Sequence, residues 1–221
     1  MTGYIIAVRG LGGVLGSLLG RPKPVKLEVR VERPLTLILH LDAASARVYS
    51  WSEMVVSVRG RARSGENVRF RLEEEDGRLY GHLYVEAASV EVRAPIEALG
   101  AILDSSSLKT SIDRPLRYIS VNADSSGVKI LAKLRRGGGL YARLDASALS
   151  AMLEPEGPGR YWVEVEAEAS GVRVEFAGRK RYRIKRRDLD NTSLRVAEPD
   201  ERADVEVEAS VTADSSSVKL L

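Results

Sequence analysis

Acidic residues open a series of short Ser-rich segments, and their carboxylates are the most regular chemical feature of this sequence. Residues 104–108 read DSSSL and residues 124–128 read DSSGV. Five aspartates share the first position: Asp104, Asp124, Asp145, Asp190 and Asp214. If these segments stack, the carboxylates form a column that repels itself unless cations or hydrogen bonds offset the charge. Calcium could offset the negative charge of the column, but the Gly-rich nonapeptide of calcium-binding β-rolls is absent. We therefore expect each aspartate to cap its own turn, with no metal site.

A dense basic run is the second candidate. Residues 179–187 read RKRYRIKRR, and alternation through Tyr182 and Ile184 is typical of a strand with one solvated face. The basic members are Arg179, Lys180, Arg181, Arg183, Lys185, Arg186 and Arg187. Such a stripe can bind polyphosphate, nucleic acid or anionic lipid. The alternative is a solvated strand whose charges discourage edge pairing.

Nucleophilic catalysis finds little support. Serine is abundant, but it needs a base, and the two histidines, His40 and His82, stand in no recognisable motif. A serine-hydrolase elbow, a phosphate loop and a dinucleotide fingerprint are all missing, and the chain contains no cysteine. Polysaccharide lyases of the β-helix type use Asp, Lys and Arg, but they have larger coils and long groove-forming loops. We expect no enzymatic activity, no cofactor and no small-molecule substrate.

The elements that position these residues follow from an internal repeat. The central residues of the acidic-x-Ser segments are 88, 106, 126, 147, 170, 192 and 216, separated by 18, 20, 21, 23, 22 and 24 residues. A looser copy is centred on Ala44, and a degenerate turn at 64–68 lies near the midpoint of the gap that follows it. Gly127 and Gly171 occupy equivalent turn positions and are expected to use positive φ.

Alternating apolar residues flank each turn, as in VEVEAEA (163–169) and VEVEASV (205–211). This spacing predicts strands with one buried face. A unit of about twenty residues cannot bury that face alone, so units must stack. The sequence predicts an all-β fold, a single-stranded right-handed β-solenoid or β-prism of stacked coils of 18–24 residues. The one helical turn we expect lies at 95–100, between Pro and Gly.

Composition agrees with a thin core and one main domain. Aromatics are only 5% of 221 residues, so small branched side chains must fill the interior. A net charge of +3 is not the footprint of a dedicated nucleic-acid binder. Residues 1–24 are expected to form an apolar Gly-rich segment, with a strand at 4–9 and a Pro linker at 21–24, and residues 25–221 the repeat domain. The 4–20 segment is alternatively a weak membrane-surface element.

The repeat resembles the "putative adhesin" family of β-solenoid domains of unknown function, found in envelope-associated proteins of bacteria and archaea. The likeness is carried by VNADSSGVKI (121–130), VTADSSSVKLL (211–221) and the strand running into Pro within 90–112. It covers residues 35–221. Bactofilin-like solenoids are similar in plan but have shorter coils. The resemblance implies a non-enzymatic scaffold, and no functional residue is carried over from either family.

The sequence therefore predicts a structural or interaction module that self-associates or displays a surface. The alternative is a protein that binds polyanions or membrane surfaces through 179–187. Strand edges at the ends of a solenoid are templates for pairing, so we expect a homo-oligomer formed through those ends. With no clear signal peptide or transmembrane helix, we expect a cytoplasmic or membrane-surface location.

Overall fold

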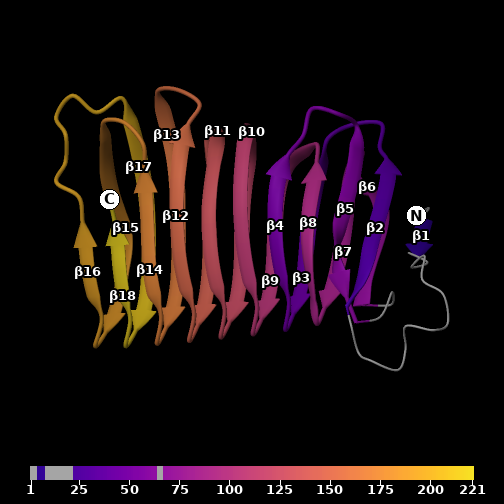
Figure 1. Ribbon diagram of the computed structural model, residues 1–221. Coiled ribbons are helices and arrows are strands. Elements are labelled where there is room, and N and C mark those ends of the chain that lie inside the picture. Colours follow the sequence, from indigo (N-terminus) through magenta and orange to yellow (C-terminus); the bar gives the residue numbers. More distant parts are fainter. Residues whose placement is uncertain (1–3, 8–21, 64–66) are drawn as a thin grey trace.

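The computed structural model describes residues 4–7, 22–63 and 67–221, and these residues form an all-β structure without α-helix (Figure 1). The strands belong to one mixed, largely parallel sheet of eighteen strands within these ranges. They are β1 (Tyr4–Ala7), β2 (Lys23–Arg30), β3 (Leu35–Asp42), β4 (Ser45–Ser50), β5 (Val55–Ala62), β6 (Val68–Glu75), β7 (Arg78–Glu86), β8 (Ala88–Ala94), β9 (Ile96–Asp104), β10 (Ser107–Asp124), β11 (Gly127–Asp145), β12 (Ala148–Pro155), β13 (Gly159–Glu168), β14 (Gly171–Phe176), β15 (Lys180–Asp190), β16 (Ser193–Val196), β17 (Val205–Asp214) and β18 (Ser217–Leu220).

The sheet has two layers that meet at the acidic-x-Ser turns. One layer runs β16-β18-β14-β12-β11-β10-β4-β8-β5-β2, and we call it layer A. The other, layer B, runs β15-β17-β13-β11-β10-β9-β3-β7-β6-β1. The long strands β10 and β11 contribute their first halves to layer A and their second halves to layer B, with irregular register where β10 crosses over.

The units do not stack in chain order. The last unit, β17–β18, lies between β13–β14 and β15–β16, as Figure 1 shows for β18. The described end of the stack is therefore β15–β16, and the C-terminal residues 218–221 do not form it. At the other side, β3–β4 lies between β7–β8 and β9–β10.

The N-terminal end departs from a simple coil. Strands β5 and β6 run antiparallel to β8 and β7, so the degenerate unit expected between the Ala44 and Ala88 copies is an antiparallel excursion. Of its expected turn at 64–68, residues 64–66 lie outside the described residues. β1 pairs with β6 in the same molecule and covers part of the strand expected at 4–9. The expected Pro linker leads directly into β2, which already includes Pro24.

The core between the layers is thin and aliphatic, as the composition predicts. It consists mainly of alternate Val, Leu, Ile and Ala residues from both layers, and Tyr161 on β13 is buried among them. The two phenylalanines, Phe70 on β6 and Phe176 on β14, are buried toward opposite ends of the stack. Pro95 does not begin a helical turn, because Ile96, Ala98 and Leu99 are buried and β9 pairs with β3 and β10. Burial of those side chains overrides the weak local helix signal.

The acidic-x-Ser turns share one hydrogen-bonded geometry that runs through the stack. In six of the eight described turns, the hydroxyl at the third position donates to the carbonyl oxygen of the acidic residue two before it, as Ser126 Oγ does to Asp124 O at 2.6 Å. The other two turns have Ala44 and Ala88 at this position. The same hydroxyl accepts the N–H of the neighbouring turn: Ser106 N donates to Ser126 Oγ at 2.9 Å, and Ser126 N donates to Ser147 Oγ at 3.0 Å. We call this chain of contacts the hydroxyl ladder. Its acceptor hydroxyls are Ser106, Ser126, Ser147, Ser170, Ser216 and Thr192.

The second turn position, and not the glycine, carries the left-handed backbone. The φ angle there is between 44° and 48° in all eight turns. The residues are Ala43, Ala87, Ser105, Ser125, Ala146, Ala169, Asn191 and Ser215. Gly127 and Gly171 do not have positive φ, and a Cβ at either would meet nothing within 4 Å. The expectation that these glycines supply the turn is therefore wrong.

Removing one hydroxyl from the ladder should be costly. Ser126→Ala deprives the buried N–H of Ser106 of its acceptor, so we expect a loss of about 1–3 kcal/mol in the free energy of unfolding. Ser125→Ala is the matched control, because its exposed hydroxyl contacts Asp124 Oδ1 and alanine already stands at four equivalent positions. The control should change stability by less than about 0.5 kcal/mol. Urea unfolding measures the stability of both variants. Equal effects of the two substitutions would contradict a stabilising role of the hydroxyl ladder.

Candidate functional site

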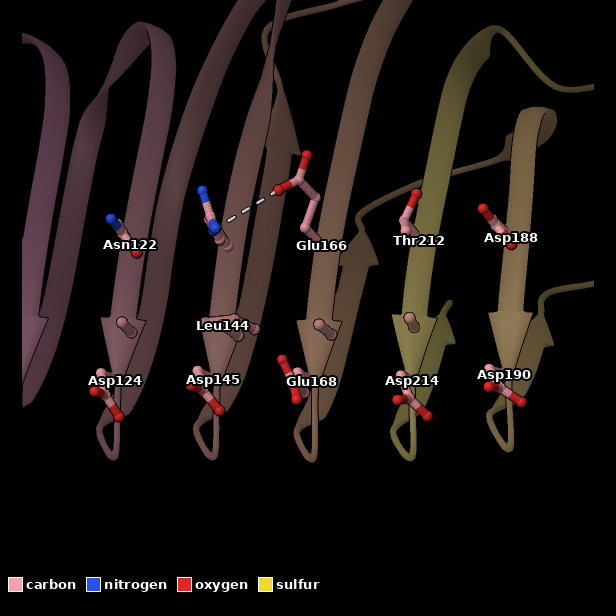
Figure 2. Close-up of a pocket in the computed structure, with 14 residues that line it drawn as sticks. Asn122, Asp124, Leu144, Asp145, Glu166, Glu168, Asp188, Asp190, Thr212 and Asp214 are labelled. Atoms are coloured by element: carbon pink, nitrogen blue, oxygen red, sulfur yellow. Dashed lines mark ion pairs between the residues drawn. The ribbon is translucent and has the colours of Figure 1, made fainter.

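The acidic column predicted from the sequence is present, and it is longer than expected. Asp104, Asp124 and Asp145 are partners in the parallel registers, and Glu168, Asp214 and Asp190 continue the column to the end of the stack. Asp42 and Glu86 extend it in the other direction. Figure 2 shows five of these carboxylates side by side at the ends of their strands.

The carboxylates of this column are exposed, and neighbouring hydroxyls supply hydrogen bonds to three of them. Ser105 Oγ donates to Asp104 Oδ1 at 2.9 Å, and Ser125 and Ser215 repeat this contact at their own turns. The turn itself is closed by the third-position hydroxyl, so the expected capping role belongs to Ser126 and its equivalents more than to the aspartates. No group of three or more His, Asp or Glu within the described ranges is arranged to hold a metal ion.

A groove of about 730 Å³ lies along this edge of layer B. Its lower rim is the acidic column, and its upper rim is the row two residues earlier, where Asn122, Glu166, Thr212 and Asp188 lie side by side (Figure 2). Arg143 belongs to the same upper row, 3.9 Å from Glu166. Between the rims, alanine and leucine side chains turn into the core. The groove is open and acidic, and it holds neither a histidine nor a serine beside a base.

The basic run 179–187 forms most of β15, the outermost strand of layer B at the described C-terminal end. Tyr182 and Ile184 pack against the core as the alternation predicts, and burial raises the pKa of Tyr182. Among the residues that the structure describes, three of the seven basic side chains form ion pairs: Lys185–Glu208 at 3.2 Å, Arg183–Glu206 at 4.0 Å and Arg186–Asp188 at 3.8 Å. A register shift between Ile184 and Arg186 leaves Lys185 as an extra, bulged residue.

That combination is the usual protection of an edge strand. Positive charges and a bulge both hinder the approach of a second strand. Carboxylates on the neighbouring β17 also offset part of the charge of the run. The interpretation as a solvated, protected edge is therefore favoured over a dedicated polyanion site.

The structure brings together two histidines that the sequence left unconnected. His40 Nε2 lies 3.3 Å from His82 Nδ1, and the His40 ring stacks on Tyr84 with centroids 4.3 Å apart. Ile38 on β3 is the register partner of His82 on β7, so the two rings lie diagonally across adjacent strands. In the sequence, the feature that could have indicated this proximity is the separation of His40 and His82 by 42 residues, about two repeat lengths. Neither histidine hydrogen-bonds to a serine within the described residues.

The histidine pair predicts a pH-dependent stability. Burial, and secondarily the neighbouring His82, hold the pKa of His40 below its ordinary value of 6.5. Folded chains then bind fewer protons than unfolded ones, so this contribution is present above pH 6.5 and is lost as the pH falls from there toward the lowered pKa. We expect the urea midpoint to decrease between pH 7.5 and 5.5, and to decrease less in His40→Gln.

Substitution of the partner provides the control for this effect. In His82→Gln, burial of His40 remains but the second charge is absent, so an intermediate pH dependence is expected. Three neighbouring groups are unchanged in both variants. Tyr84 stacks on His40, Glu73 lies 3.9 Å from His82, and the guanidinium of Arg69 lies over the Tyr84 ring. Identical pH dependence in wild type and His40→Gln would show that the pair does not contribute.

Comparison with known proteins finds no matching family model and no match among curated proteins. Solved structures do match over most of the chain. A "putative cell adhesion protein" from Clostridium sporogenes is 12% identical over 90% of this chain and 99% of its own, with a TM-score of 0.43. A "putative lipid binding protein" from Parabacteroides distasonis is 13% identical over 90% and 96%, with a TM-score of 0.37. A "putative adhesin" from Bacteroides fragilis is 7% identical over 90% and 97%, with a TM-score of 0.35. At low identity and over most of its length, the chain therefore resembles structures named as adhesins, as its motifs predict.

Proposed function

We propose that this chain is a non-enzymatic interaction module of the adhesion type, a right-handed β-solenoid scaffold that displays rows of side chains to a partner. One observation carries the proposal: the parallel registers align equivalent residues of successive units without a break, from Asp42 to Asp190 along the acidic column. Right-handed crossover is the general rule for parallel strands joined within a sheet.

Alignment of this kind supports binding along a line more than binding in a pocket. The acidic column repeats one chemical group, a carboxylate, at the strand spacing of about 4.8 Å. A partner that engages several positions gains affinity by multivalency, although each contact is weak. The grooves of the described surface are open and shallow, which suits an extended partner better than an enclosed small molecule.

Self-association through the ends of the stack stays a prediction, and the strand edges oppose it. β15 has its bulge and positive charges, and β2 contains Pro24 with Lys23 and Lys26. Both features are devices that block strand addition. β1 pairs with β6 of the same molecule, which supports its interpretation as an internal cap. Surface display is therefore the form of the module that we favour.

Light scattering after size-exclusion chromatography separates the two forms. We expect the full chain to elute as a 24.2 kDa monomer at high micromolar concentration. Removing charge from the edge by changing Arg181, Arg183 and Lys185 to Thr should produce concentration-dependent association, because the edge then lacks its protection.

A variant with the same loss of charge on inner strands serves as the control. Changing Arg47, Lys109 and Lys129 to Thr leaves β15 intact, so this variant should remain monomeric. An oligomeric wild type that dissociates on shortening at its N-terminus to residue 26 would establish end-to-end assembly in place of monomeric display.

A further inference from the structure

A row of mostly basic residues crosses the outer face of layer A, in register with Lys109 and Lys129, which lie five residues after the acidic residues of their turns. The parallel and antiparallel registers connect ten strands through this position without interruption. The residues in order are Lys26, Arg59, Glu91, Arg47, Lys109, Lys129, Ser150, Arg173, Lys219 and Arg195. Eight of the ten are basic and exposed, and we call them the basic ladder. Nine strand spacings give it a length of about 43 Å.

The ladder is largely without counter-charges. Ion pairs reach Lys26 and Arg59 through Glu28, at 3.2 and 3.5 Å, and Arg173 through Glu175 at 3.0 Å. The other five have no carboxylate within 4 Å among the described residues: Arg47, Lys109, Lys129, Lys219 and Arg195. Like charges on directly opposed residues destabilise a sheet. Ser150 shows that a neutral residue fits the position, so the fold itself does not require the charges.

The corresponding row on layer B has no such bias. Two residues before the acidic residue, at the same distance from the turn, the side chains are mixed in kind. They are Arg69, Tyr84, His40, Ile102, Asn122, Arg143, Glu166, Thr212 and Asp188. General exposure to solvent therefore does not account for the ladder. One face of one layer concentrates positive charge on a single line.

The rows on either side of the ladder define the shape of a partner. On the turn side lies a row of small residues, mostly Ser, Gly and Ala, where a Cβ at Gly127 or Gly171 would meet open space. This row forms a low shelf with hydroxyl groups. On the other side, Leu131 and Met152 are register partners, and each is 48% exposed. A partner lying along the ladder thus meets cations, hydroxyls and an apolar pair together.

From this arrangement we propose that layer A binds a linear acidic polysaccharide along the basic ladder; this rests on the proposed display function and names its partner. A pyranose unit is close in length to one strand spacing, so successive carboxylates or sulfates can face successive cations. Sugar hydroxyls can hydrogen-bond to the serine shelf, and the C–H faces of the rings can pack on Leu131 and Met152. The charge pattern and the apolar pair are both matched by this one class of polymer.

Two other polyanions fit the face less well. A planar anionic membrane would press against Glu28, Glu91 and Glu175, which lie beside or within the ladder. Single-stranded nucleic acid needs aromatic platforms for its bases. On this face Tyr49 is half-buried, and its ring is covered by the guanidinium of Arg93 at 6.0 Å from the centroid.

Binding of the full chain to polygalacturonate and to heparin tests the proposal and distinguishes carboxylate from sulfate. The ladder variant carries Gln at Arg47, Lys109 and Lys129, and the matched control carries Gln at Arg181, Arg183 and Lys185, with the same change of charge. We expect the ladder variant to lose affinity by about tenfold or more and the control by less than about twofold. Thermal unfolding should show that both variants are folded, since all six side chains are exposed.

A gain of function and a length series complete the test. Ser150→Lys closes a gap in the ladder and should strengthen binding, whereas loss of fold cannot produce that result. Affinity for galacturonate oligomers should rise with length up to about nine units and then level off, because the ladder has about nine spacings. Equal losses in the two triple variants, affinity independent of length, or tighter binding of single-stranded DNA or phosphatidylglycerol vesicles would each overturn the proposal. A monomeric chain that fails these binding tests would leave the display scaffold standing without this partner.

Discussion

The hydrogen bond between a buried turn hydroxyl and the backbone of the next turn is the interaction on which the rest of this structure depends. A chain that reverses direction between two layers exposes N–H and C=O groups at the corner, and these must be satisfied. Here Asp124 O accepts both the Ser126 hydroxyl and the Ser105 N–H, and the Ser126 hydroxyl accepts the N–H of Ser106. The hydrogen-bonding ladder therefore continues around the corner. This satisfaction offsets the cost of a non-glycine residue at φ near 45°, of order 1–3 kcal/mol.

The hydrogen bonds that continue through the turns also fix the register of the side-chain rows on the surface. Each turn is hydrogen-bonded to its neighbours at three consecutive peptides. A slip of one residue would therefore break every contact of the hydroxyl ladder and move every side chain to the opposite face of its strand. Rows on both layers are held in register from β7–β8 to β15–β16. The charges on those rows consequently belong to the stack as a whole. The turn edge is acidic, and the row that lies five residues after the acidic residue, on layer A, is mostly basic.

Much of this was readable from the sequence, and the failures have physical causes. The spacing of the acidic-x-Ser segments predicts the turns, their central residues and the acidic column. It does so because the hydroxyl ladder requires a small residue with a hydroxyl group at one fixed position. Order along the stack is not encoded locally: β17–β18 and β3–β4 have the same motif as their neighbours, and only long-range packing decides where they insert. Positive φ is expected at Gly127 because local rules assign it to glycine, whereas tertiary hydrogen bonds impose it on Ser125. The basic ladder is not apparent in the sequence, because residues that are adjacent in it are twenty or more positions apart along the chain and become neighbours only through register.

The gaps in the basic ladder affect how it can bind a ligand. Ser150 lies between Lys129 and Arg173, and Glu91 lies between Arg59 and Arg47, so the longest unbroken basic run has three members. A ligand shorter than such a run gains little from the rest of the stack, whereas a long polymer bridges the gaps and adds the separate runs. Rigid spacing keeps the entropic cost of each additional contact low, because the cations are already in line. Affinity on a scaffold of this kind is set by the length and charge spacing of the partner, so selectivity arises without any cavity that encloses it.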